Sequence, residues 1–266
     1  MTIHKQVLEM IRKILGNKPL VEVIFELHWE LHEQAPEIKI DPHYKLLVGR
    51  IYERVKDEYP FHEQLPTATI PDEIAGYIVQ HRFRKDKDEW PLIQVGPGII
   101  TLNDTDGYVW ENFEKRISHV LDIFFEAYPL TEKKIMINKS LLRYIDAVSF
   151  DYEKEDIFVF LKEKMKMSIE IHNDLFEKTG IGNLPLGLDL RFSFPSVEPH
   201  GAMHFRFARG KRKDGDALIW ETMVESLGDD SPQSKKDITI WVEKAHQLTD
   251  NWFFEMIGGE LLRRFE

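Results

Sequence analysis

KPLVEVIFELHW, residues 18–29, is the stretch from which the fold of this chain can be worked out. Pro19 excludes a helix that continues from the preceding segment, because proline has no N–H and crowds the turn before it. After Pro19 the side chains alternate, with Val21, Val23, Phe25 and Leu27 on one face and Glu22, Ile24, Glu26 and His28 on the other. This period of two predicts a strand. Carboxylates on one face need water or charged partners, because an unpaired buried carboxylate is costly.

Helices and strands alternate around this stretch. The periodicity predicts helices over 3–15, 41–59 and 108–128, strands over 76–85 and 135–150, and two extended pieces that kink at the Gly-Pro-Gly of residues 96–98. The order β-α-β-β-α-β is that of the ferredoxin-like unit. We therefore expect residues 1–152 to form a ferredoxin-like half in which the first and last strands are neighbours. The carboxylate face of residues 18–29 would then lie at the centre of the open side of the sheet.

The second half, residues 153–266, predicts an antiparallel sheet covered by a long C-terminal helix. We expect a short helix over 154–165, a short strand from Met167 to His172, and strands over 186–195, 201–210 and 217–226. Ser231-Pro232 is expected to open the final helix, whose apolar residues recur every three or four positions. Because the join at 150–154 is poor in proline and glycine, we expect the halves to pack tightly. The predicted class is α+β.

Composition narrows the function. The chain has 266 residues and a formal net charge of −11, which disfavours nucleic acid as a partner. The absence of cysteine excludes disulfides and thiolate chemistry. No apolar run approaches the roughly 18 residues that span a bilayer. The first fifteen residues carry early charge and no small-residue cleavage site, so we expect a cytoplasmic protein.

Several motifs together resemble a bacterial family that is sporadically distributed and has no established function. They are PLVEVIFELHW at 19–29, QVGPGIITLND at 94–104 with Y-x-W-x-x-F after it, LLRYIDAV at 141–148, and His246 followed by Phe253 or Phe254. The family more often has Asn where this chain has Asp146. The patchy occurrence implies accessory genes of mobile elements and of phage-defence or toxin-like loci. The resemblance brings no catalytic residues and no cofactor.

The first candidate site consists of Glu22, Glu26 and Arg143. If the first and last strands of the N-terminal half are neighbours, Arg143 can meet a glutamate across the ladder, where opposed Cβ atoms lie within about 5 Å. Such a cluster can act as an anion or carboxylate site with an acid of altered pKa. The alternative is a charge pair that satisfies polar groups where the two halves pack.

The second candidate site lies on one face of the C-terminal sheet. The alternation places five charged or titratable side chains there, namely Asp189, Arg191, His204, Arg206 and Glu221, with Ser193 and Glu225 beside them. Arginines and a histidine on one floor are suited to a phosphate or nucleotide. The alternative is a solvated face with cross-strand ion pairs, since antiparallel sheets often expose one side.

Other chemistry has weaker support. His28 and His32 lie four residues apart, as do His200 and His204, but neither pair has a clear third ligand. The sequence has no nucleophile elbow, no phosphate-binding loop and no dinucleotide fingerprint. We therefore expect neither metal nor cofactor.

The leading functional hypothesis is a non-catalytic binding protein, an accessory or phage-defence component that senses or docks a protein partner encoded nearby, with a homo-oligomer also open. One alternative is a hydrolase or nuclease that uses glutamate, histidine and arginine on the sheet faces. A further alternative is a small-ligand or lipid site between the sheet and the long helix.

Overall fold

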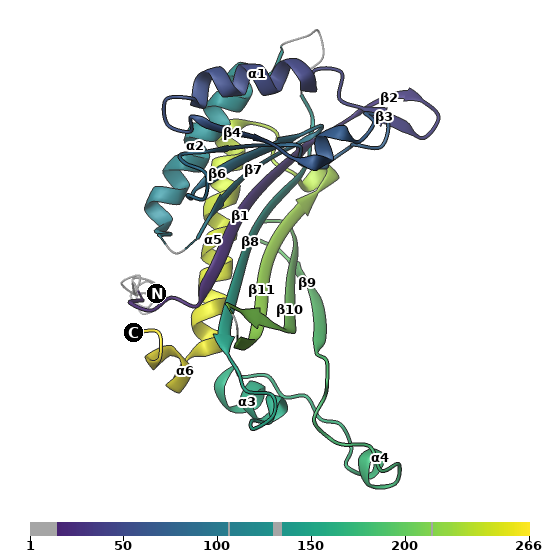
Figure 1. Cartoon of the computed structure of the whole chain (residues 1–266), viewed down its shortest axis with the longest axis vertical. Helices are drawn as coiled ribbons and strands as arrows, with labels where there is room; N and C mark the ends of the chain where they lie inside the picture. The colour runs from purple at the N-terminus through teal and green to yellow at the C-terminus, as the bar shows by residue number, and fades with distance from the viewer. Residues whose placement is uncertain (1–14, 106, 130–134, 214) are drawn as a thin grey trace, which may run out of the picture.

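A computed structural model describes residues 15–105, 107–129, 135–213 and 215–266. Almost all of the predicted helix over 3–15 lies outside these ranges. The described chain is an α+β structure in which one nine-stranded antiparallel sheet carries its main helices on one face (Figure 1). The other face of the sheet is not covered by these helices.

The stretch at 18–29 forms the middle strand of this sheet. In spatial order the strands are β4 (Phe61–Gln64), β5 (His81–Arg84), β6 (Leu92–Gly96), β7 (Ile99–Asp104), β1 (Leu20–Trp29), β8 (Ile137–Ser149), β11 (Gly215–Leu227), β10 (Gly201–Arg212) and β9 (Asp189–Ser196). β1 pairs with β8, so the predicted first and last strands of the N-terminal half are neighbours. β8 pairs in turn with β11, and the sheet therefore runs without interruption from the first half into the second.

The N-terminal half differs from the expected order at the Gly-Pro-Gly segment, at the short strand β4, and at the unpredicted hairpin of β2 (His32–Ala35) and β3 (Ile38–Ile40). The Gly-Pro-Gly segment is a tight turn between β6 and β7. The two extended pieces that were expected to meet at a kink are therefore two strands paired antiparallel to each other. Gly98 has a φ of 77°, and a Cβ there would lie 2.7 Å from the side chain of Leu31, which restricts the position to glycine. As a result β7 runs antiparallel to β1. The short strand β4 lies where we expected a loop.

The predicted strand from Met167 to His172 is wrong. The chain there has no strand conformation and is largely exposed between α3 (Ile157–Lys164) and α4 (Asp174–Glu177). Its alternating pattern has no strand edge to pair with, and a period of two without a partner strand does not make a sheet. The segment instead extends away from the body, with α4 near its tip (Figure 1).

Three long helices cover the sheet: α1 (Tyr44–Val55), α2 (Trp110–Ala127) and α5 (Lys235–Ile257). The apolar stripe predicted for α5 is buried, including Trp241, Val242 and Ala245. The helix begins later than expected, with Ser234 as its N-cap. The remaining described elements are the hairpin β2 (His32–Ala35) and β3 (Ile38–Ile40), the short helix α6 (Glu260–Arg263), and 3-10 turns at Pro66–Thr69 and Gly228–Asp230. No helix in the described part of the chain is long and apolar enough to cross a membrane.

The two faces of β1 have the character that its alternation predicts. Phe25 and Leu27 are fully buried beneath the helices. Glu22 and Glu26 lie on the opposite face. The alternation fails only at the start, where a shift in register between Leu20 and Glu22 turns Leu20 into the core and leaves Val21 exposed.

Candidate functional site

Charged side chains form a band across the open face of the sheet. Asp189 on β9 accepts a hydrogen bond from Arg206 Nε at 2.8 Å. Arg206 Nη1 donates to Glu221 at 2.9 Å, and Glu221 also pairs with Arg143 on β8. Arg191 binds the same Asp189. We call this set, from β9 to β8, the first row of the band.

A second row runs parallel to the first. Ser193 Oγ lies 2.8 Å from His204 Nδ1, and His204 Nε2 lies 2.9 Å from Glu225 Oε1. Lys139 then lies between two carboxylates, 3.5 Å from Glu225 and 3.7 Å from Glu26. The open face thus joins side chains from β9, β10, β11, β8 and β1 into a single polar network.

The central glutamates have separate partners. Glu22 accepts from Asn103 Nδ2 of β7 at 2.7 Å, and Glu26 Oε1 lies 2.6 Å from His28 Nε2. Desolvation acts to raise the pKa of Glu26, but His28, Lys139 and Arg143 outweigh it and leave that pKa below its ordinary value. Glu26 is therefore a carboxylate at neutral pH, held by its neighbours.

The prediction that Arg143 pairs directly with Glu22 or Glu26 is wrong. The residue opposite Arg143 on β1 is Ile24, because the register places both glutamates diagonally to the arginine. Arg143 instead pairs with Glu221, across the join between the two halves. The two candidate sites are consequently joined at two points: Arg143 pairs with Glu221, and Lys139 lies between Glu26 and Glu225.

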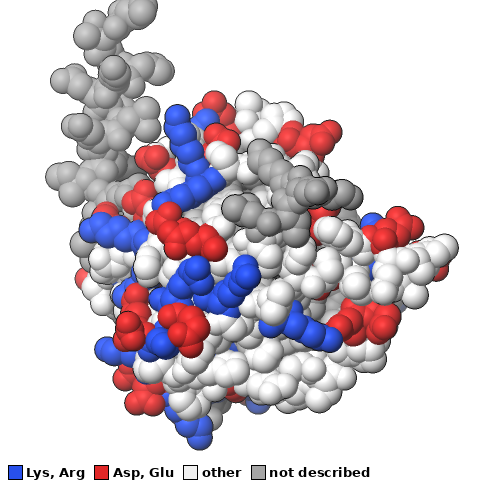
Figure 2. Space-filling model, turned by 90° about the horizontal axis from the view of Figure 1, so that it is seen from above, with Lys and Arg blue, Asp and Glu red and all other residues white. Residues whose placement is uncertain are grey.

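The network has the composition of a solvated ion-pair face. Its arginines are already engaged by carboxylates, which leaves little of their charge for a phosphate. Lys, Arg, Asp and Glu are also interspersed over the surface seen from above in Figure 2. Among the described residues no group of three histidine or acidic side chains is placed to hold a metal ion.

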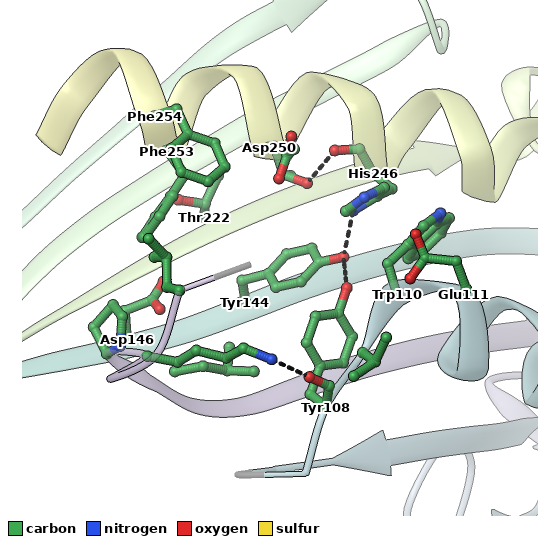
Figure 3. Close-up of a pocket in the computed structure, with 16 residues that line it drawn as sticks. Tyr108, Trp110, Glu111, Tyr144, Asp146, Thr222, His246, Asp250, Phe253 and Phe254 are labelled. Carbon is green, nitrogen blue, oxygen red and sulfur yellow. Dashed lines mark hydrogen bonds between the residues drawn. The ribbon is translucent and has the colours of Figure 1, made fainter. Parts of the chain in front are cut away.

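A cavity of about 150 Å³ lies on the other side of the same sheet, under α5. Five parts of the chain converge on it (Figure 3): residues 15–20 at and before the start of β1, the turn into α2, β8, β11 and the C-terminal half of α5. On β8 and β11 the helix-facing row is polar at this point, so Tyr144, Asp146 and Thr222 present polar groups to the cavity. Aromatic rings supply much of the wall, from Tyr108, Trp110, Tyr144, Phe253 and Phe254.

Three hydrogen-bonded side chains span the cavity from the turn before α2 to α5. Tyr144 Oη lies 3.0 Å from Tyr108 Oη and 2.9 Å from His246 Nδ1 (Figure 3). Burial raises the pKa of Tyr144 well above its ordinary value, and Tyr108 adds to this effect. Tyr144 is therefore a neutral phenol that connects the other two groups.

The imidazole of His246 is fixed from a second direction. Trp110 stacks on it with a centroid separation of 3.6 Å and an interplanar angle of 14°. His246 is 4% exposed. A ring held by a stack and a hydrogen bond has one orientation, so this wall of the cavity is preorganised.

Two polar groups in the lining, Asp146 and Thr222, make no side-chain hydrogen bond within the part of the chain that the structure describes. Asp146 is 4% exposed and its carboxyl makes no hydrogen bond with any residue that the structure describes. The hydroxyl of Thr222, on the neighbouring strand, is buried and likewise unbonded within the described chain. Desolvation raises the pKa of Asp146 to about 8, although the charge of Arg212 acts against the rise. Buried groups of this kind are costly, so two of them in one cavity wall need an explanation.

Sequence reasoning placed none of these residues in a site. The alternation places Tyr144 and Thr222 on the faces opposite Arg143 and Glu221, and Asp146 and His246 enter only through the family resemblance. A usable signal was nevertheless present. Polar side chains interrupt helix-facing rows that are otherwise apolar, at Tyr144, Asp146 and Thr222.

No family model and no curated protein matches the chain. Among solved structures, the TBP of Methanococcus jannaschii is 12% identical, with a TM-score of 0.20, over 89% of this chain and 97% of that one. A likeness at that score carries no argument about fold or function, so the functional argument for this chain rests on its own geometry.

Proposed function

We propose that this protein is a non-catalytic binding protein whose ligand is a small molecule held between the sheet and α5. The observation that carries the proposal is the unpartnered pair Asp146 and Thr222, both buried and both lining one cavity. An unsatisfied buried polar group costs about 1–3 kcal/mol. A ligand that completes their hydrogen bonds would offset that cost.

The aromatic and polar lining supports the same function. Ligand sites are concave, mostly apolar, and contain a few polar groups that set orientation. Here the rings of Trp110 and Phe253 supply apolar wall, and the chain from Tyr108 to His246 supplies a fixed polar edge. The cavity thus has both parts of such a site in preformed positions.

Native mass spectrometry tests this proposal on protein purified without denaturation from the cells that express it. We expect a bound small molecule in the wild type and its loss in Thr249→Leu, which places a larger side chain into the cavity from α5. Thr239→Leu is the matched control, because Thr239 is on the same helix, also donates to a backbone carbonyl, and is not part of the lining. If the wild type carries no bound species and takes up none from an extract of the host cells, the proposal fails.

Docking of a protein partner is the second candidate function. The segment between α3 and β9 projects from the body and exposes apolar side chains, including Leu175 at 59%, Ile181 at 65% and Leu186 at 93%. Exposed apolar residues gathered on one projection favour a partner surface. The accessory or defence-linked role, a partner encoded nearby and a homo-oligomer stay proposals that rest on the resemblance. The ferredoxin-like assignment of the N-terminal half is also a proposal.

Replacing Leu175, Ile181 and Leu186 together with serine tests the docking function. A partner captured by the wild type should be lost, with the thermal unfolding midpoint unchanged, because these side chains pack on little of the body. The same three substitutions would leave the small-ligand function intact. A partner retained by the triple variant would exclude this segment as the docking surface.

The hydrolase alternative keeps one geometric argument, the line from Ser193 through His204 to Glu225. The three residue types match a Ser-His-acid triad. Here the serine hydroxyl contacts Nδ1 and the carboxylate contacts Nε2, which is the reverse of the arrangement in the serine proteases. Turnover of p-nitrophenyl acetate that is lost in Ser193→Ala and kept in Ser196→Ala would favour it. Equal background rates in all three proteins would exclude it for this ester.

A further inference from the structure

The size of the cavity limits the ligand. Its volume is about 150 Å³, and a cavity of about that volume lined by apolar side chains takes up benzene. The buried part of the ligand is therefore of the order of one six-membered ring. The aromatic walls from α2 and α5 favour a flat or compact apolar body.

The polar end of the ligand is set by Asp146 and Thr222. In the register of β8 and β11, Asp146 lies opposite Trp220, and Thr222 lies opposite Tyr144. The two polar side chains are therefore diagonal neighbours on one face, about 7–8 Å apart. An atom placed between them can reach both. Once Asp146 is ionised its carboxylate only accepts hydrogen bonds, and the hydroxyl of Thr222 can also accept one, so the ligand atom that complements the ionised site is a donor.

The sign of the ligand's charge follows from the carboxyl. Burial raises the pKa of Asp146 to about 8, so the empty protein keeps this group protonated near neutral pH. A cation restores the ionised form, because an opposite charge within hydrogen-bond distance compensates the lost hydration. The faces of the surrounding rings also attract a cation. An anion would lie next to a carboxyl group and gain neither effect.

The charged and titratable groups around Asp146 come from several elements. They are Arg212 at the end of β10, Lys18 ahead of β1, Tyr144 on β8 itself, and His246 and Asp250 on α5. The guanidinium of Arg212 donates to the carbonyl of Ala147, and the ammonium of Lys18 donates to the carbonyl of Tyr108. Neither cation makes a hydrogen bond to Asp146 within the described chain, so the position beside its carboxyl is open to a ligand's charge.

We infer that the ligand of this cavity is a small organic ammonium ion, with its nitrogen between Asp146 and Thr222 and its apolar body against the aromatic walls. The inference rests on the proposed function, since it names the chemical class for the same cavity. On binding, the ammonium ion displaces the proton of Asp146 to solvent, and the side chain becomes a carboxylate paired with the ligand.

Three probes of nearly equal shape test the charge: benzylamine, benzyl alcohol and benzoate. In isothermal titration calorimetry of the full chain, we expect benzylamine to bind at least about tenfold more tightly than benzyl alcohol, because only the amine brings a charge to the carboxyl. We expect no measurable binding of benzoate. Between pH 6 and pH 8 the affinity for benzylamine should rise by up to about tenfold per pH unit, since the carboxyl must lose its proton.

Two variants decide whether Asp146 is the partner. Asp146→Asn keeps the shape and removes the charge, and should reduce benzylamine binding to the level of benzyl alcohol and abolish the pH dependence. Glu221→Gln removes a carboxylate from the opposite face of the same sheet. It should change neither the affinity for benzylamine nor the pH dependence of that affinity. Circular dichroism of each variant confirms that it is folded.

Each other outcome overturns the assignment. Equal binding of benzylamine and benzyl alcohol, or tighter binding of benzoate, would reject an ammonium ligand while leaving a small-ligand cavity in place. Failure of all three probes would reject the ammonium assignment as well. The mass spectrometry described above would then decide separately whether the cavity has another ligand.

Discussion

The open face and the helix-covered face of this sheet treat polar groups in opposite ways. On the open face, Glu26, Arg143, Glu221 and their neighbours form ion pairs and remain partly in water. On the covered face, Asp146 and Thr222 are almost fully buried and have no partner within the described chain. The open face carries more charge, but its paired polar groups cost less folding free energy than the two unbonded polar groups on the covered face.

This difference indicates where function is to be sought. A band of paired charges explains its own presence, because each carboxylate is neutralised by a neighbour and by solvent. An unpartnered acid beneath a helix does not, since removing it would stabilise the fold. The open face carries more charged residues, whereas the covered face carries the polar groups whose burial is costly.

The largest effect that can break this comparison is expected for Asp146→Asn. The pKa of this carboxyl is about 8 in the folded protein and 3.8 in its ordinary state. The contribution of this group to stability should therefore be complete below about pH 4 and be lost as the pH rises towards 8, because the unfolded chain releases the proton first. At about 1.4 kcal/mol per unit of pKa, the loss is on the order of 5 kcal/mol. Urea unfolding at pH 4 and pH 9 should show this loss of stability in the wild type and not in Asp146→Asn.

Asp189→Asn is the control on the other face. Hydrogen bonds from Arg206 and Arg191 hold the pKa of Asp189 well below its ordinary value. Its contribution is present above the unfolded pKa and is lost as the pH falls, so its sign is opposite to that of Asp146. If the two variants respond to pH in the same direction, the contrast between the faces is incorrect.

A smaller effect is expected for Tyr144→Phe. The substitution removes the hydroxyl that connects Tyr108 with His246 and leaves both buried groups short of a hydrogen bond. We expect the free energy of unfolding to fall by about 1–3 kcal/mol. Tyr152→Phe is the control, since its hydroxyl makes only a 3.5 Å contact with the carbonyl of Ala217. Equal losses in the two variants would show that the chain across the cavity adds nothing.

Replacing Thr222 and Thr101, two of the buried threonines, with valine tests the comparison through the sign of the stability change. Thr222→Val replaces an unpartnered hydroxyl with a methyl group and should stabilise the protein by about 1 kcal/mol. Thr101→Val makes the same change on the open face, where the hydroxyl donates to Asn103 at 2.7 Å, and should destabilise it by a similar amount. Chemical denaturation measures both changes in the free energy of unfolding, provided that the variants and the wild type have equal m-values. Destabilisation by Thr222→Val would mean that its hydroxyl is satisfied.

The smallest effect is expected for Glu221→Gln. Glu221 pairs with both Arg143 and Arg206, but these ion pairs are partly exposed and exchange freely with hydration. We expect a loss of about 1 kcal/mol or less, and a wild-type advantage that shrinks in high salt. A large loss that salt does not change would show that this band is a buried structural network instead.

Much of the fold follows from local periodicity. The alternation of residues 18–29 predicted β1, and similar patterns predicted β8 and the strands from β9 to β11. The stripe of α5 predicted a helix lying across a sheet, because its apolar side chains need an apolar surface. Short strands such as β4 escaped prediction, since four residues give too few alternations to be distinguished from a loop.

The site was harder to predict because its parts are distant in sequence. Tyr108, Tyr144 and His246 are joined by two hydrogen bonds, yet they come from the turn before α2, from β8 and from α5. No spacing rule within one segment relates residues that meet only after the sheet and the helices have packed. The partner of Arg143 was missed for a related reason, because the register that places Ile24 opposite it is fixed only when the strands pair.

The sequence by itself determined which side chains share a face, because strand and helix periods are fixed by backbone geometry. It therefore specified an α+β chain, the polar row of β1 and the mixed charges of the C-terminal strands. Only the tertiary structure decided that Arg143 pairs with Glu221, since strand register sets that contact. The tertiary structure also decided that Asp146 lies unpartnered beneath α5, because burial and hydrogen bonding are properties of packed elements.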